Sequence, residues 1–110
     1  MDDDYAEAVL DLVALIPPGR AMTYGTVADE VADRLAAHGG RRRGGPRQVG
    51  QVMARAGGGV PWWRVVNASG GFPDRLRARA REAWLDEGMP LTADGTRVAL
   101  RRAIWFPDEG

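Results

Sequence analysis

We expect residues 1–110 to fold as one mainly α-helical domain with a small β-hairpin near its C-terminal end. Three observations support this fold class. A length of 110 residues is typical of a single domain. Hydrophobic residues make up 45% of the chain and charged residues 27%, which indicates a globular fold rather than disorder. Apolar residues recur at helical spacing in segments that are separated by glycine- and proline-rich breaks.

The first two helices are predicted from apolar stripes with clear ends. We expect the first helix over residues 4–16, where Pro17 and Gly19 end it in a turn. We expect the second from the N-cap Thr23 to about Ala37. The first stripe comprises Tyr5, Val9, Leu12, Val13 and Ile16. The second comprises Val27, Val31 and Leu35, with Ala28 and Ala32 beside them.

Two further helices are expected after a basic loop over residues 39–45. Pro46 suits the first position of a helix that runs to about Ala56, where three consecutive glycines interrupt the chain. Residues 63–66 suit a short strand, and the last helix is expected from residue 74 or 75 to residue 87. The side chains that these two helices should bury are Val49, Val52 or Met53, Ala56, Leu76, Ala80, Ala83 and Trp84.

A hairpin is predicted beyond the last helix. Residues 91–92 and 96–100 flank the turn sequence Ala93-Asp94-Gly95. Helices joined by a glycine-containing connection and followed by a hairpin resemble a winged helix-turn-helix, although this connection is longer than usual. The residues expected to close the core are Ile104, Trp105 and Phe106.

Composition excludes several classes of function. The chain has no cysteine, which excludes disulfides, thiolate metal sites and cysteine nucleophiles. The only histidine, His38, lies in a Gly/Arg-rich stretch, so we expect it to be solvated and expect no metal or other cofactor. No segment approaches the roughly 18 apolar residues of a membrane span, and the acidic residues 1–4 do not resemble a signal peptide. We therefore expect no membrane partner and a cytoplasmic location.

The charges are unevenly distributed although the formal net charge is zero. Residues 1–33 carry eight acidic residues and one Arg, whereas residues 34–81 carry eleven Arg and one acidic residue. Residues 82–110 carry six acidic residues and three Arg. A basic segment between acidic ends suggests a surface for a polyanion such as nucleic acid. The alternative is that these arginines only solvate the surface.

Two adjacent tryptophans, Trp62 and Trp63, follow the glycine run and Pro61. Adjacent side chains of an extended strand point to opposite faces, so both indoles cannot face the same core. One of them needs another partner. That partner is either the C-terminal segment or a flat ligand such as a base, for which an indole provides a stacking surface.

Three segments resemble the C-terminal domain of the O6-alkylguanine-DNA alkyltransferases. Residues 16–28 (IPPGRAMTYGTVA) resemble the opening of that domain, and residues 46–53 (PRQVGQVM) resemble its recognition helix. Residues 60–66 (VPWWRVV) resemble its active-site Pro-Cys-His-Arg-Val-Val motif. The matches keep their order along the chain. Members of the family transfer the alkyl group of O6-alkylguanine to the cysteine of that motif.

This chain departs from the transferase motif at its reactive positions. Trp62 stands at the position of the cysteine, and Trp63 at that of the following histidine. The resemblance therefore implies an alkyltransferase-like protein, a class that carries Trp or Ala in place of the cysteine. Such proteins bind the lesion by base flipping and pass it to nucleotide excision repair. Glu87 matches the acid behind the histidine, and we expect it to be structural, as we expect for Arg64.

The resemblance also implies roles in DNA binding through the minor groove. Tyr24 would crowd the 3′ phosphate of the flipped nucleotide, and Arg47 would enter the base stack, which suits a weakly hydrated guanidinium. The alternatives are a core aromatic for Tyr24 and a phosphate contact or a surface ion pair for Arg47. Gly50 lets backbone approach a ligand closely. The implied DNA-binding residues are Tyr24, Gly25, Arg47, Gln48, Gly50 and Gln51.

The implied lesion pocket includes Trp62 as an open wall. Val65 and Ser69 match positions near the rim, and Arg75 stands where alkyltransferase-like proteins can carry a lesion-facing arginine. We expect Trp63 to point away and pack toward the helix that carries Glu87. The implied lesion-pocket residues are Tyr24, Trp62, Val65, Ser69 and Arg75.

The expected function is non-enzymatic recognition of DNA damage by a monomer. The expected partners are double-stranded DNA containing O6-alkylguanine and proteins of nucleotide excision repair. One alternative is a sequence-specific winged-helix transcription factor, in which both tryptophans belong to the core. A second alternative is a hydrolase that uses Glu87, but no nucleophile and base occur at a recognisable spacing.

Overall fold

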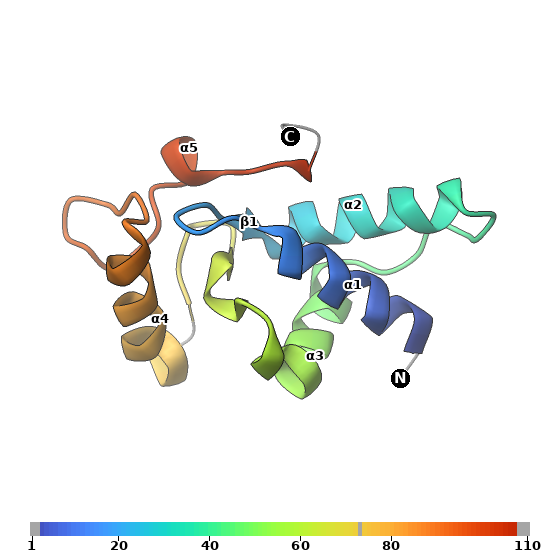
Figure 1. The fold of residues 1–110 in the computed structure, drawn as a ribbon, viewed down its shortest axis with the longest axis horizontal. Helices are drawn as coiled ribbons and strands as arrows, with labels where there is room; N and C mark the ends of the chain where they lie inside the picture. Colours follow the sequence, from blue (N-terminus) through green and yellow to red (C-terminus); the bar gives the residue numbers. More distant parts are fainter. Residues whose placement is uncertain (1–2, 73, 108–110) are drawn as a thin grey trace.

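The computed structural model describes residues 3–72 and 74–107, whose arrangement is shown in Figure 1. Met1 and Asp2, which begin the acidic N-terminal sequence, lie outside the described residues. The predicted mainly helical fold is confirmed, and the last, short helix is one that periodicity did not predict. The helices are α1 (Asp3–Leu15), α2 (Tyr24–Ala37), α3 (Pro46–Ala56), α4 (Asp74–Glu87) and α5 (Leu100–Ala103). In the described part of the chain, no helix has the length and apolarity to cross a membrane.

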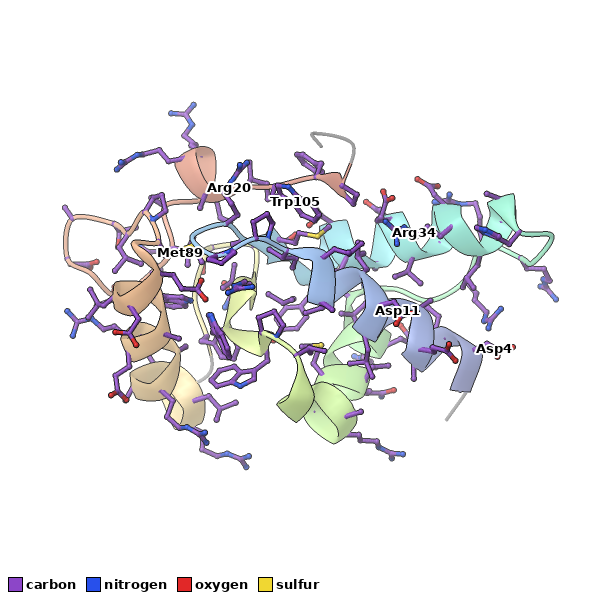
Figure 2. The ribbon with its side chains drawn as sticks, viewed as in Figure 1. Asp4, Asp11, Arg20, Arg34, Met89 and Trp105 are labelled. Atoms are coloured by element: carbon purple, nitrogen blue, oxygen red, sulfur yellow. The ribbon has the colours of Figure 1, made fainter. Side chains whose placement is uncertain are left out.

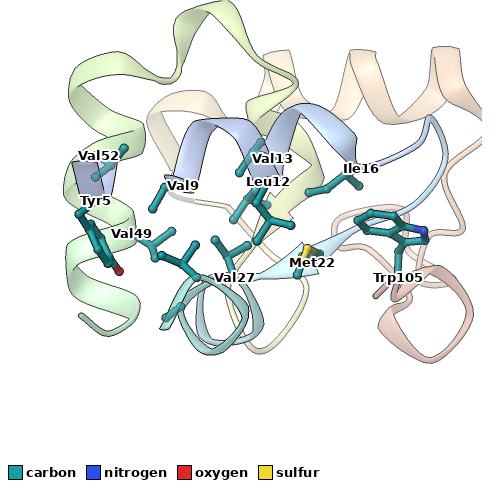
Figure 3. Close-up of a cluster of buried hydrophobic side chains, with 13 residues drawn as sticks. Tyr5, Val9, Leu12, Val13, Ile16, Met22, Val27, Val49, Val52 and Trp105 are labelled. Carbon is teal, nitrogen blue, oxygen red and sulfur yellow. The ribbon is translucent and has the colours of Figure 1, made fainter. Parts of the chain in front are cut away.

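Helices α1, α2 and α3 pack around the first of two apolar clusters, part of which is shown in Figure 3. All the predicted stripe residues of α1 are buried, and so are Val27, Val49 and Val52. The prediction was wrong for Ala56, which is exposed where α3 ends. It was also wrong for Phe106, which is 45% exposed and follows the buried Trp105, labelled in Figure 2.

The second apolar cluster lies under α4, at the end of the molecule opposite α2 (Figure 1). Trp84 is fully buried, and its Nε1 donates a hydrogen bond to the Trp63 carbonyl oxygen at 2.7 Å. Ala80 is buried as predicted, whereas Leu76 and Ala83 are half-buried. The hydrogen bond to Trp63 therefore ties α4 to the backbone of the chain between α3 and α4.

A two-stranded parallel sheet connects segments that are far apart in the sequence. Strand β1 (Met22–Thr23) pairs with β2 (Val65–Val66), with Met22 opposite Val65. The strand predicted over residues 63–66 is thus shorter than expected. Residues Trp62–Arg64 form the 3₁₀ helix η2 instead, in which Arg64 N donates to the Pro61 carbonyl oxygen at 3.0 Å. A second 3₁₀ helix, η1 (Gly57–Gly59), follows α3.

The predicted hairpin is present as one antiparallel bridge between Leu91 and Val98. Gly95 adopts a φ of 72° in the turn, a conformation that favours glycine. The Asp94 carboxylate holds the turn by accepting hydrogen bonds from Thr92 Oγ1 and Thr96 N, and these bonds lower its pKa to about 2. The expected second strand ends early because Leu100 begins α5.

Candidate nucleic-acid interface

A cavity of about 590 Å³ lies between α3 and α4. Its volume falls in the range of roughly 300–1,000 Å³ that is typical of ligand pockets. Four residues predicted for DNA or lesion binding meet here: Tyr24, Gly50, Trp62 and Arg75. The other lining residues are Met53, Ala54, Gly57, Gly58, Phe72, Leu76 and Arg79. No acidic residue is among the lining residues, so the cavity combines an apolar wall with two cationic side chains.

Tyr24 reaches this cavity because it is the first residue of α2. The preceding residue, Thr23, caps the helix, since its Oγ1 accepts a hydrogen bond from Thr26 N at 3.0 Å. The Tyr24 side chain is half-buried and packs against the first apolar cluster. Burial raises the pKa of the Tyr24 phenol, so its hydroxyl stays neutral and can donate a hydrogen bond near neutral pH. Tyr24 therefore contacts the core, as expected of a core aromatic, and also lines the cavity, as expected of a DNA-binding residue.

Trp62 forms an aromatic wall of the cavity. Its ring makes edge contacts with Phe72 at a centroid distance of 5.4 Å and with Trp63 at 5.6 Å. The Arg79 guanidinium lies 5.9 Å from the Trp62 ring centroid, within cation–π range. Trp62 thus lines a cavity, and its role as the wall of a lesion pocket stays a prediction. The extended backbone assumed for it was wrong, because Trp62 begins η2.

Trp63 points away from the cavity and toward Glu87, as predicted. Trp63 Nε1 donates a hydrogen bond to Glu87 Oε2 at 2.8 Å. The same carboxylate pairs with the Arg64 guanidinium and accepts a hydrogen bond from Gly19 N at 3.0 Å. Arg64 also donates to the Ile16 carbonyl oxygen at 2.7 Å. Arg64 and Glu87 therefore tie the end of α1, η2 and the end of α4 together, which is a structural role.

Helix α3 presents a different flank to each of two cavities. Gly50, Met53 and Ala54 line the cavity that contains Trp62. Gln48 and Gln51 line a second cavity of about 450 Å³ on the other flank. Arg47 is exposed at the start of the helix. The predicted recognition helix thus offers polar and small side chains to solvent while Val49 and Val52 hold it in the core.

Comparison with known proteins identifies the family. The family described as "6-O-methylguanine DNA methyltransferase, DNA binding domain" matches residues 4–88. The chain belongs to this family. The match includes α2 to α4, all of α1 but its first residue, and every residue of the cavity between α3 and α4.

Several relatives resemble this member of the family over most of its length. A protein of Escherichia coli (strain K12), named DNA base-flipping protein, is 36% identical in an alignment 110 residues long. The alignment covers 94% of this chain and 76% of that protein. A DNA base-flipping protein of Vibrio parahaemolyticus is 27% identical and the match covers 96% and 99% of the two chains. A crystal structure of S. pombe Atl1 in complex with damaged DNA containing O6-carboxymethylguanine matches with a TM-score of 0.74 and 30% identity, covering 97% of this chain and 99% of that chain.

This family member contains no cysteine. The resemblance matches Trp62 to the cysteine of the transferase motif. Among residues 3–72 and 74–107, no group of three or more His, Asp or Glu side chains could hold a metal ion. What the described cavity provides is surface for binding: aromatic faces, small residues and arginines.

Two of the predicted pocket residues do not line this cavity. Val65 is fully buried in the first cluster, because its pairing with Met22 turns its side chain into the core. Ser69 is exposed, but its hydroxyl donates a hydrogen bond to Asn67 Oδ1 at 2.7 Å within the turn before α4. Gly25 lies beside the cavity in the first turn of α2 and does not line it. The cavity is thus lined by more residues of α4, and by fewer from the segment around Val65, than the resemblance implied.

Sequence reasoning missed Arg79 as a site residue. Arg79 lies one helical turn after Arg75, and both line the cavity. The spacing of four residues on a predicted helix was a signal that could have found it, since such residues share a face. Phe72 was also missed. Its contact with Trp62 depends on the path of the chain before α4, which has no local sequence signature.

Proposed function

We propose that the protein recognises O6-alkylguanine in duplex DNA without repairing it. In this proposal, α3 enters the minor groove and the damaged nucleotide rotates out of the duplex into the cavity between α3 and α4. The observation that carries the proposal is the meeting of Tyr24, Trp62 and Arg75 at one cavity, in a chain without a cysteine. The resemblance to a structure bound to damaged DNA, at 30% identity over nearly the whole chain, supports it.

Extrusion of the base requires a group that fills the gap in the stack. Arg47 is exposed near the start of α3, where its planar guanidinium can stack between neighbouring bases. Unstacking and unpairing a base costs a few kcal/mol, and less at a damaged pair. Because O6 alkylation weakens pairing with cytosine, a lesion is extruded more readily than guanine. Tyr24, at the mouth of the cavity, would crowd the phosphate and favour the rotated nucleotide.

The cavity then selects the extruded base by stacking and by fit. A base stacked on an aromatic ring gains about 1–3 kcal/mol, which is enough to offset much of the extrusion cost. Trp62 provides the ring, and Met53 and Phe72 provide apolar surface for an alkyl group. Gly50 and Gly58, where a Cβ would meet nothing within 4 Å, leave room for the approach of the DNA backbone.

The bound lesion would remain chemically unchanged. Trp62 has no nucleophilic atom comparable to a thiolate, so the complex dissociates rather than forming an alkylated protein. We propose that a monomer marks the lesion for nucleotide excision repair in the cytoplasm. Recruitment of a repair protein to the complex is the step that converts recognition into repair.

A titration of paired oligonucleotides tests the proposal. Two duplexes that differ only by one O6-methylguanine are compared at physiological salt, and we expect the damaged duplex to bind more tightly. A parallel incubation with radiolabelled O6-methylguanine DNA should leave no label on the denatured protein. Equal affinity for the two duplexes would contradict lesion recognition and favour a sequence-specific transcription factor. Stoichiometric label on the protein would show that it is an enzyme.

A further inference from the structure

A second cavity, of about 450 Å³, lies on the flank of α3 opposite the Trp62 cavity. Its α3 residues follow one another at helical spacing, as do those of the other flank. The rest of its wall comes from α1 and from the basic loop before α3. Its principal lining residues are Tyr5, Arg43, Gly44, Gln48, Gln51 and Arg55.

The wall of this cavity is fixed by packing between the loop and α1. Tyr5 is buried in the first cluster and lies beside Val49 and Val52 in Figure 3. Gly44 has a φ of 84°, and a Cβ at this position would lie 2.3 Å from the Tyr5 hydroxyl oxygen. The Arg43 guanidinium lies 6.0 Å from the centre of the Tyr5 ring. The loop therefore holds Arg43 at the cavity through contacts that only glycine permits at residue 44.

The chemistry of the lining suits an anion. Arg43 and Arg55 supply two positive charges, Gln48 and Gln51 supply amide donors, and none of the lining residues is acidic. Arg55 is exposed on the last turn of α3. Arg42, which precedes Arg43 in the loop, is paired with Asp33. Among the residues that the structure describes, Arg55 forms no ion pair. Arg55 thus remains available to a ligand.

We propose that this second cavity binds a phosphodiester of the DNA strand opposite the lesion. The inference rests on the proposed docking of α3 in the minor groove, where a helix has one sugar-phosphate backbone on each flank. The flank with Gly50 and Trp62 takes the strand that carries the flipped nucleotide. The flank with Arg43 and Arg55 then faces the complementary strand. Phosphate contacts of this kind set the position of a protein on the duplex without reading sequence.

The salt dependence of binding by Arg55→Gln measures this contact. Arg55 is exposed, so the substitution leaves the fold intact. Each neutralised phosphate contributes about 0.9 to the slope of log affinity against log salt on B-DNA. Between 50 and 200 mM salt, the wild type should lose about 3.5-fold more affinity for duplex DNA than Arg55→Gln. Arg101→Gln, on the exposed face of α5, is the matched control and should keep the wild-type slope.

Two further comparisons identify the strand. On a single-stranded oligonucleotide with the same lesion, Arg55→Gln should bind as the wild type does, because the complementary strand is absent. Uncharged methylphosphonate linkages in the complementary strand should weaken the wild type but not Arg55→Gln. The same linkages in the lesion strand should weaken both proteins equally.

The outcomes separate this inference from the proposed function. Equal slopes for wild type and Arg55→Gln on duplex DNA would overturn the phosphate contact. Equal weakening on single-stranded and duplex DNA would overturn its assignment to the complementary strand. Arg55→Gln should leave the ratio of affinities for damaged and undamaged duplex unchanged. If the wild type shows no such preference while the slopes still differ, lesion recognition fails and the phosphate contact stands.

Discussion

Replacing Glu87 by Gln should destabilise the protein more than any other single charge removal on α4. The Glu87 carboxylate accepts hydrogen bonds from Gly19 N, Trp63 Nε1 and the Arg64 guanidinium, and the Arg64 and Glu87 side chains are 13% and 11% exposed. Removing one partner of a buried ion pair costs about 3–5 kcal/mol. Because both side chains still reach solvent and Gln keeps one acceptor, we expect a loss of about 2–3 kcal/mol.

The pH dependence of stability provides a second signature of the same group. Burial acts to raise the pKa of Glu87, but the hydrogen bonds from Arg64, Gly19 and Trp63 and the Arg64 charge outweigh it, so the pKa lies below its usual value. A carboxylate with a lowered folded pKa stabilises the protein above its unfolded pKa of about 4.3. This contribution is lost as the pH falls through the lower folded pKa. The difference between wild type and Glu87→Gln should therefore shrink from pH 7 toward pH 3.

Urea denaturation followed by tryptophan fluorescence measures both effects. A loss of about 2–3 kcal/mol is a large share of the roughly 5–15 kcal/mol that stabilises a domain of this size. In thermal unfolding it corresponds to a drop of about 10–15 °C. Glu82→Gln, on the exposed face of the same helix, is the control and should change stability by less than about 0.5 kcal/mol. Equal midpoints for the two variants, or a pH-independent gap, would refute the role assigned to the network.

Three further tests, which use five substitutions, address separate parts of the structure. Trp63→Ala should cost about 2–4 kcal/mol in urea denaturation and Trp62→Ala about 1–2 kcal/mol, because Trp63 also loses its hydrogen bond to Glu87; equal costs would contradict this ranking. Gly70→Ala should cost about 2 kcal/mol or more, since φ is 85° and a Cβ would lie 2.2 Å from the Val98 carbonyl oxygen, whereas the open Gly59→Ala should be nearly neutral in the same assay. Arg47→Ala should weaken DNA binding in a titration while changing stability by less than about 0.5 kcal/mol, and a large loss of stability would show that Arg47 is structural.

The helices were predictable because each has a local pattern. Val9, Leu12 and Val13 recur on one face of α1, and all of them are fully buried. Thr23 begins α2 through a hydrogen bond within three residues, so the sequence signal is also local. The sheet was not predictable in this way. Its pairing joins Met22 to Val65, and the pairing energy depends on where α2 and α3 place those segments.

The residues of the site were predictable where they belong to local motifs and were not predictable where their position depends on long-range packing. Trp62 and Tyr24 were recognisable from short motifs, and the structure places both at the cavity. Val65 was assigned to the rim because the resemblance matches it to a position there, but the parallel pairing with Met22 turns its side chain into the core. Phe72 was missed because its contact with Trp62 depends on the path of the chain before α4. Side chains placed by long-range packing are the part of a site that local sequence predicts least well.

Under the proposed function, the two tryptophans allow this site to bind a lesion but not to react with it. Trp63 Nε1 donates to Glu87, but an indole N–H is only a donor and cannot accept a proton from a nucleophile. Trp62 presents an aromatic ring to the cavity, and the resemblance matches its position to the cysteine of the transferase motif. Binding through stacking and fit alone leaves the protein unaltered when the DNA dissociates. Under the proposed function, one molecule of this protein can therefore mark many lesions in turn, whereas a self-alkylating relative is consumed by one.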